Sequence, residues 1–193
     1  MNKTKMSGFL LVASTVLLII SMLYVESLYP SYSRADNYIS DLGVGPTASI
    51  FNTAAIIAGL GIVIAAALLF QNENQNKKEN KNNKLTAALL GIAGIGITGI
   101  GVFPENTGAV HVIFTAITFL FGALAAIASS RNAKSPTSKI FVLLGLISLV
   151  ALTLIAAGET LGLGVGGIER LVACPLLLWT LVYGAQLLFN KET

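Results

Sequence analysis

Six stretches of this chain are long and apolar enough to cross a lipid bilayer. They lie near residues 7–25, 48–70, 85–103, 111–130, 139–157 and 168–189. A spanning helix needs about 20 mainly apolar residues, because the hydrocarbon core is about 30 Å thick and each residue rises about 1.5 Å. The stretches are continuously apolar rather than alternating, which favours helices over barrel strands. The sequence therefore predicts an all-α, polytopic membrane protein. We expect one domain over residues 1–193, with six transmembrane helices arranged as three hairpins.

The composition excludes the other broad classes. Of the 193 residues, 54% are hydrophobic and 11% are charged, whereas soluble domains carry about 25% charge and disordered chains have low hydrophobicity. The first stretch has a basic start at Lys3 and Lys5, as a signal peptide would. Its apolar run from Gly8 to Val25 is longer than a signal peptide's apolar region, so we expect an uncleaved first span.

Lys and Arg predict the orientation. Ten of the twelve basic residues fall in the two tails and in the connections around 71–84 and 130–139. The opposite side has only Arg34 and Arg170. Basic residues accumulate on the cytoplasmic side, so both termini are predicted to be cytoplasmic. The Asn- and Lys-rich segment 71–84 is expected to be a solvated connector. The predicted localisation is the cell membrane, as a multi-pass protein.

Most of the acidic residues and the single histidine fall at the outer ends of the predicted helices. This arrangement predicts that a set of polar residues at one depth gathers in space. The set is Ser40, Asp41, Asn52, Glu105, His111, Glu159, Glu169 and Arg170. Ionisable residues in a membrane bundle are functional candidates because they are costly to place there.

These residue types suggest acid–base chemistry on a lipid or a lipid-linked substrate. His111 is the candidate general base, with its tautomer set by Asp41 or Glu105. Ser40 is a candidate nucleophile for acyl transfer or hydrolysis. Arg170 is a candidate for binding a phosphate or carboxylate headgroup. The remaining candidates for substrate binding are Glu169, Asn52 and Glu159.

Other readings of the same residues stay open. Asp41 is also suited to a turn or a helix cap, and a lone histidine at a helix start is often only a hydrogen-bonding residue. An ion pair between Arg170 and Glu169, Glu159, Asp41 or Glu105 would tie hairpins together without catalysis. A non-catalytic sensor, scaffold or assembly module is therefore the alternative to an enzyme. A small transporter is less favoured, because the predicted spans have no charge at mid-membrane.

The sequence offers little for a metal or a nucleic acid. Cys174 is the only cysteine and His111 the only histidine. Carboxylates with one histidine can bind a hard cation or a single transition metal, but no carboxylate spacing here matches a metal motif, so no metal site is predicted. The basic segment 71–84 has no interleaved aromatic residues, which argues against nucleic acid. The expected partners are the lipid bilayer and a lipid or lipid-linked substrate. No cofactor or oligomeric state follows from the sequence.

Small residues in the third stretch predict close helix packing. Gly91, Gly94, Thr98 and Gly101 are spaced three, four and three residues apart, so they share one helix face. Small side chains let membrane helices approach closely where no hydrophobic force acts between them. We expect this face to contact a neighbouring helix.

The run YSRADNYISDLGVGPTASIFN, at residues 32–52, resembles the signature of the domain-of-unknown-function 998 family of prokaryotic membrane proteins. The later runs GVFPENTGAVH and GGIER resemble further signature regions of that family. The ISDLG and IFN motifs are also distantly similar to the ISDTG block of Frag/DRAM/Sfk-type proteins, although Leu42 and Thr47 depart from that pattern. That wider family includes a factor in lipid remodelling of GPI anchors. The resemblance implies a family and does not by itself supply a reaction.

Overall fold

The computed structural model describes residues 2–72 and 77–189. These residues form α-helices and short 3-10 helices, and they include no strand. The α-helices are α1 (Lys3–Leu28), α2 (Ala48–Phe70), α3 (Lys77–Val102), α4 (Ala109–Ser129), α5 (Thr137–Ala156) and α6 (Gly164–Phe189). The 3-10 helices are η1 (Ser40–Gly43), η2 (Gly45–Thr47) and η3 (Glu105–Thr107). All six α-helices are long and apolar enough to cross a membrane, which confirms the predicted fold class.

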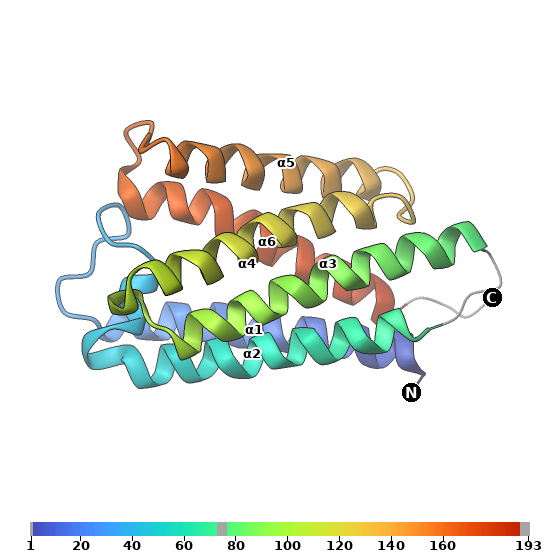
Figure 1. The fold of residues 1–193 in the computed structure, drawn as a ribbon, viewed down its shortest axis with the longest axis horizontal. Helices are drawn as coiled ribbons and strands as arrows, with labels where there is room; N and C mark the ends of the chain where they lie inside the picture. Colours follow the sequence, from blue (N-terminus) through green and yellow to red (C-terminus); the bar gives the residue numbers. More distant parts are fainter. Residues whose placement is uncertain (1, 73–76, 190–193) are drawn as a thin grey trace.

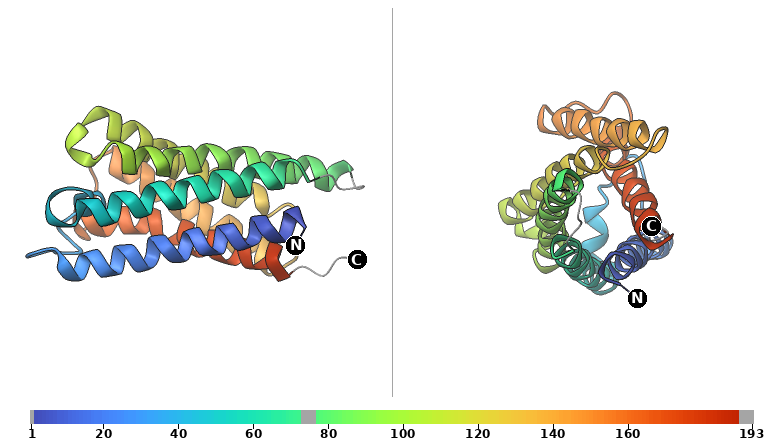
Figure 2. Two further views of the ribbon diagram at one scale, coloured as in Figure 1. Left: turned by 90° about the horizontal axis from the view of Figure 1, so that it is seen from below. Right: turned by 90° about the vertical axis from the view of Figure 1, so that its right-hand side faces the viewer.

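The helices run up and down as three hairpins, so that α1 begins and α6 ends at the same end of the bundle (Figure 1). Each helix packs against the next in the chain, and α6 returns to contact α1. Viewed along the bundle, α1, α2, α3, α4 and α6 surround a common centre while α5 lies outside them (Figure 2, right). The long segment between α1 and α2 lies across the far end of that centre. The fold is thus a five-helix ring with one peripheral helix.

Polar side chains join the helices where their backbones come close. Ser7 Oγ donates to the Ala65 carbonyl between α1 and α2 at 2.8 Å, and Ser148 Oγ donates to the Val172 carbonyl between α5 and α6 at 2.6 Å. Such bonds satisfy hydroxyl groups that lipid cannot satisfy.

The third helix starts earlier than its apolar stretch. Residues 77–84 form its first two turns, so the expectation of a connector over 71–84 is wrong for these residues; 73–76 lie outside the described residues. The polar turns are held by the α4–α5 connection: Asn132 Nδ2 donates to Asn83 Oδ1 at 2.8 Å and to the Glu79 carbonyl at 3.0 Å. The hydropathy pattern does not predict these helical turns, because hydrogen bonds at the end of the bundle stabilise them and not burial in lipid.

The predicted small-residue face of α3 lies against α2. A Cβ added to Gly94 would lie 3.1 Å from the Gly59 carbonyl oxygen, and one added to Gly101 would lie 2.6 Å from the Asn52 carbonyl oxygen. In return, a Cβ on Gly59 would lie 2.5 Å from the Thr98 nitrogen. Real Cβ atoms essentially never come within 3.0 Å of another atom, and 3.1 Å is already unusually tight, so the two helices touch because glycine occupies these positions.

Gly59→Ala should therefore destabilise the protein by about 1–3 kcal/mol, the usual cost of overpacking. Gly91→Ala is the matched control, because a Cβ there meets only the Ala66 side chain at an ordinary 3.4 Å. Both changes raise helix propensity equally, so their difference isolates packing. Equilibrium unfolding in detergent measures it, and equal stabilities of the two variants would contradict this account of the α2–α3 contact.

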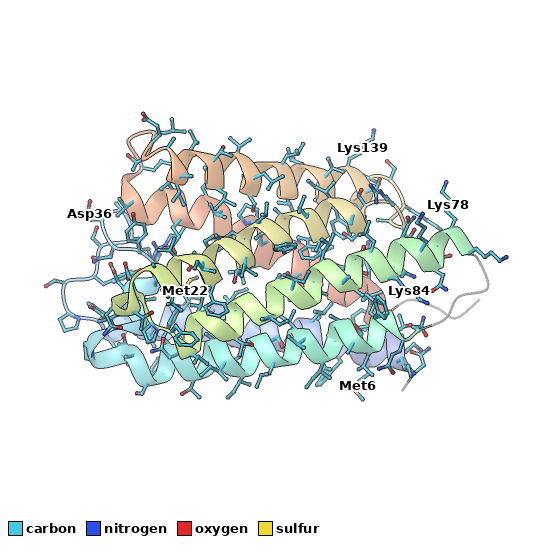
Figure 3. The ribbon with its side chains drawn as sticks, in the orientation of Figure 1. Met6, Met22, Asp36, Lys78, Lys84 and Lys139 are labelled. Atoms are coloured by element: carbon cyan, nitrogen blue, oxygen red, sulfur yellow. The ribbon has the colours of Figure 1, made fainter. Side chains whose placement is uncertain are left out.

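Charge is segregated along the bundle axis. Lys78, Lys84 and Lys139 lie at one end, and Asp36 lies at the other (Figure 3). The 3-10 helices lie at the acidic end, with the α1–α2 and α3–α4 connections. We call the end with Asp36 and the 3-10 helices the acidic end.

Candidate functional site

The centre of the helix ring contains a cavity of about 150 Å³. Residues of α1, α2, α3, α4 and α6 line it, together with Ile39 and Ser40 of the α1–α2 segment. Most of the lining is aliphatic or aromatic. The larger polar side chains, His111 and Glu169, are at the acidic end with Ser40, while Trp179 lies ten residues further along α6. At 1.5 Å per residue, the cavity spans about 15 Å along the helix.

The α1–α2 segment closes the acidic end of the cavity. Its 3-10 turns are fixed locally: Thr47 Oγ1 donates to the Leu42 carbonyl at 2.8 Å, and Asn52 Nδ2 of α2 donates to the Gly43 carbonyl at 2.9 Å. The Ile39 backbone N–H donates to a carboxylate oxygen of Glu169 on α6. Asn52 therefore holds the segment and does not itself line the cavity.

His111, in the first turn of α4, is buried, with 5% of its surface exposed. Its Nδ1 lies 2.8 Å from the Phe103 carbonyl oxygen. A carbonyl can only accept, so Nδ1 carries the hydrogen, and in the neutral imidazole Nε2 carries the lone pair. Nε2 is buried without a hydrogen-bond partner among the described residues. The predicted partner that sets this tautomer was a carboxylate, Asp41 or Glu105; the observed partner is the Phe103 backbone carbonyl.

Two more buried polar atoms near the acidic end lack a partner among the described residues, namely Glu105 Oε2 and Thr115 Oγ1. Thr115 lies one helical turn after His111 and lines the same cavity. Buried polar atoms are nearly always hydrogen-bonded in proteins. Three unpartnered atoms on η3 and α4 therefore mark a place that can bind a polar group. Thr115 was not among the predicted site residues, although its spacing of four residues from His111 was a usable signal.

Three carboxyl groups from three hairpins converge at this end. Burial raises the pKa of Tyr38, and the nearby charges of Glu169, Glu105 and Asp41 raise it further. Asp41 also accepts a hydrogen bond from Asn37 Nδ2 at 2.8 Å. The convergence of these three acids was predicted from their common depth.

Glu105 shows the effect of this crowding most clearly. Its carboxyl is partly buried, and its pKa is raised from 4.5 to about 7. Burial is the largest cause, and the neighbouring Asp41 carboxyl also raises the pKa, while a hydrogen bond with Ser40 partly offsets the rise. Glu105 therefore changes protonation near neutral pH, which suits a group that exchanges protons.

The protein should become less stable as pH rises from 4.5 to about 7. The folded state binds the Glu105 proton more tightly than the unfolded chain, so stability is highest below this range and falls across it. Thermal unfolding in detergent should give a higher Tm at the acidic limit. Glu105→Gln should reduce this slope, while Glu159→Gln should keep it. An unchanged slope in Glu105→Gln would contradict the assignment.

Arg170 lies one residue after Glu169 and holds a different set of groups. Its Nη2 donates to Glu26 Oε1 at 2.6 Å and to the Tyr32 hydroxyl at 2.8 Å. Its Nη1 donates to three backbone carbonyls, those of Gly166, Arg34 and Asn37. The expected carboxylate partner was Glu169, Glu159, Asp41 or Glu105; the observed partner is Glu26.

Glu26 was not among the predicted site residues, because in the sequence nothing distinguishes it from the other acidic residues at the outer helix ends. Its side chain is 5% exposed and also accepts from the exposed Arg34 Nε at 2.8 Å. The signal that could have found it is Arg170 itself, since a lone cation at an acidic end needs a buried partner. Together Glu26, Tyr32 and Arg170 clamp α1 and the α1–α2 segment to α6. We call these three residues the arginine clamp.

Glu159 does not join the site. Its predicted place was the end of the fifth helix, but α5 ends at Ala156, and Glu159 lies exposed in the α5–α6 connection. The backbone there turns through Gly158 and Gly162, which have positive φ angles of 74° and 76° that favour glycine. This turn keeps Glu159 outside the cavity lining, whereas Glu169 falls in the second turn of α6.

Within residues 2–72 and 77–189, no three His, Cys, Asp or Glu side chains are arranged to hold a metal ion.

Comparison with known families shows which family the chain belongs to. Residues 12–186 match the family described as "Protein of unknown function (DUF998)". The chain belongs to the DUF998 family. Neither the curated proteins nor the solved structures contain a match.

The DUF998 match covers all six helices in whole or in part, and thus the cavity and the arginine clamp. With its six apolar helices, this DUF998 protein is an integral, multi-pass membrane protein. The wider similarity to Frag/DRAM/Sfk-type proteins stays a prediction from the ISDLG motif.

Proposed function

We propose that this DUF998 protein binds a lipid or lipid-linked substrate inside the helix ring and acts on it by hydrolysis or acyl transfer at the outer leaflet. One observation carries the proposal: His111 Nε2 is buried and unpartnered at the polar end of an otherwise apolar cavity. An apolar cavity with a few convergent polar groups is the usual form of a small-molecule site.

The shape of the cavity suits one hydrocarbon chain. It runs about 15 Å from Glu169 to Trp179, which is about half of the ~30 Å hydrocarbon core. A chain that enters from one leaflet would end inside the cavity, and its polar group would stay beside Ser40 and His111. The surface around the chain is made of apolar residues of five helices.

The chemistry follows from the His111 tautomer. Nε2 takes a proton from water as the water oxygen bonds to the acyl carbon, and the acyl C–O bond then breaks. The imidazolium returns its proton to the leaving oxygen, so the histidine ends unchanged. In acyl transfer, a substrate hydroxyl replaces the water. Ser40 lines the same cavity and is the candidate nucleophile in a two-step version.

Blocking the cavity tests substrate binding. Ala173 lines the cavity on α6, so Ala173→Phe should abolish release or transfer of a radiolabelled acyl chain from phosphatidylethanolamine vesicles. Ala116→Phe is the control, because Ala116 lies exposed on α4. Thin-layer chromatography of the lipids measures the products. Equal turnover by the two variants would show that the chain does not occupy the cavity.

The proposed outer-leaflet site requires the acidic end to face away from the cytoplasm. The lysines at the opposite end support this orientation. In a Cys174→Ser background, an impermeant thiol reagent applied to intact cells should label Leu161→Cys and should not label Lys81→Cys. Both positions are exposed, so accessibility is matched. The reverse pattern would place the site at the cytoplasmic face.

A non-catalytic membrane module is the second candidate. The arginine clamp favours it, because both terminal nitrogens of Arg170 already hold protein groups and leave it poorly suited to a substrate headgroup. In that case the polar end would only hold the hairpins together. The two functions differ in their dependence on His111, which the clamp does not contain.

A further inference from the structure

We propose that the substrate headgroup bound at the acidic end is cationic and carries a protonated amine. This inference rests on the proposed function, since it names the class of lipid that the cavity takes. It starts from Glu169, whose side chain is buried with 6% of the residue exposed and lines the cavity. No Lys or Arg is among the described residues that line the cavity.

The two nearby cationic side chains, Arg170 and Arg34, already bind protein groups. Arg170 holds Glu26, Tyr32 and three backbone carbonyls, and it does not line the cavity. Arg34 is exposed and pairs with the same Glu26 carboxylate. A headgroup that carries only negative charge, such as a sulfate, would therefore meet carboxylates without a free cation. Like charges at short distance in a partly buried site repel strongly.

Two of the three unpartnered atoms near the acidic end need a hydrogen-bond donor, while the third, the Thr115 hydroxyl, can donate or accept. Because His111 Nδ1 holds the hydrogen, the buried Nε2 can only accept, and Glu105 Oε2 is a second buried oxygen without a partner among the described residues. An ammonium group offers three donors and no acceptor. Glu169 supplies the opposite charge, and the reacting water supplies the donor for Nε2. This combination of charge and acceptors selects an amine over an anionic group.

Trp179 provides a direct reporter. It is the only tryptophan of the chain, and it lines the cavity about 15 Å from Glu169. A bromine at the end of an eleven-carbon chain would lie beside its ring when the headgroup lies at the acidic end. Bromine quenches indole fluorescence on contact, so quenching of Trp179 measures occupancy of the cavity.

The test compares two probes of one chain length, ω-brominated undecylamine and ω-brominated undecyl sulfate. The protein is held in phosphatidylcholine nanodiscs. The amine should reach half-maximal quenching at about a tenfold lower concentration than the sulfate, because a charge-assisted hydrogen bond changes affinity by about that factor or more. Glu169→Gln should remove the preference for the amine. Glu159→Gln should retain it, since Glu159 is an exposed carboxylate outside the cavity.

The outcomes separate the two proposals. Equal or tighter quenching by the sulfate would overturn the cationic headgroup while leaving the chain cavity intact. An unchanged preference in folded Glu169→Gln would overturn the role of that carboxylate. Absence of saturable quenching by both probes would instead contradict the proposed function, because no chain would reach Trp179. The comparison of probes on the unmodified protein stands even where a variant fails to fold.

Discussion

Arg170→Ala should destabilise the protein by about 3–5 kcal/mol, the largest loss of stability we expect from a single substitution at the acidic end. The change removes the donor from a Glu26 side chain that is 5% exposed. It also removes the donor to three backbone carbonyls of the α1–α2 segment and α6. Breaking a buried pair is costly because the remaining charge is left without its partner.

Arg34→Ala is the matched control, because Arg34 pairs with the same carboxylate from the surface. Its side chain is 66% exposed, and exposed ion pairs contribute about 0–1 kcal/mol. Arg170→Lys should fall between the two, since lysine keeps the charge without the planar fork of donors. Equilibrium unfolding in detergent gives all three values. If Arg170→Ala is no worse than Arg34→Ala, the arginine clamp does not hold the hairpins together.

The second large effect is expected on activity. His111→Asn should lower the rate of acyl release or transfer by about 10²–10⁴, the usual contribution of a general base. Asparagine places its amide nitrogen where His111 has Nδ1, so it can still donate to the Phe103 carbonyl and the fold of the first turn of α4 should persist. The readouts are turnover of labelled phosphatidylethanolamine and, in parallel, the unfolding midpoint. Glu159→Gln, which alters an exposed acid outside the cavity, should retain activity.

Ser40→Ala then separates two mechanisms. Lost activity with an unchanged fold would support a covalent step on Ser40, whereas retained activity would support water activated by His111. Full activity of His111→Asn would overturn the catalytic proposal and favour the non-catalytic module. In that case, the unpartnered Nε2 would have only a binding role.

The position of the site along the bundle axis was predictable from the sequence, but the side of each helix that faces the site was not. Ser40, Glu105 and Glu169 all follow or precede apolar stretches at the acidic end, so their common level could be read from hydropathy. Which side of each helix faces the centre depends on how the helices rotate against each other. Glu169 and Arg170 illustrate this: they are adjacent in sequence, yet one lines the cavity and the other holds the arginine clamp.

The sequence alone determined the six spans, their pairing into hairpins and the segregation of charge along the axis. A backbone that crosses lipid must satisfy its own hydrogen bonds, so each span is a long apolar helix regardless of which helices lie beside it. The small-residue face of α3 was also readable, since residues three and four apart share a face. Only the tertiary structure decided that Glu26 pairs with Arg170, that Glu159 stays outside and that five helices enclose a cavity. Those outcomes depend on packing between segments distant in sequence. In lipid, that packing is set by close fit and a few polar contacts, which leave little periodic trace in the chain.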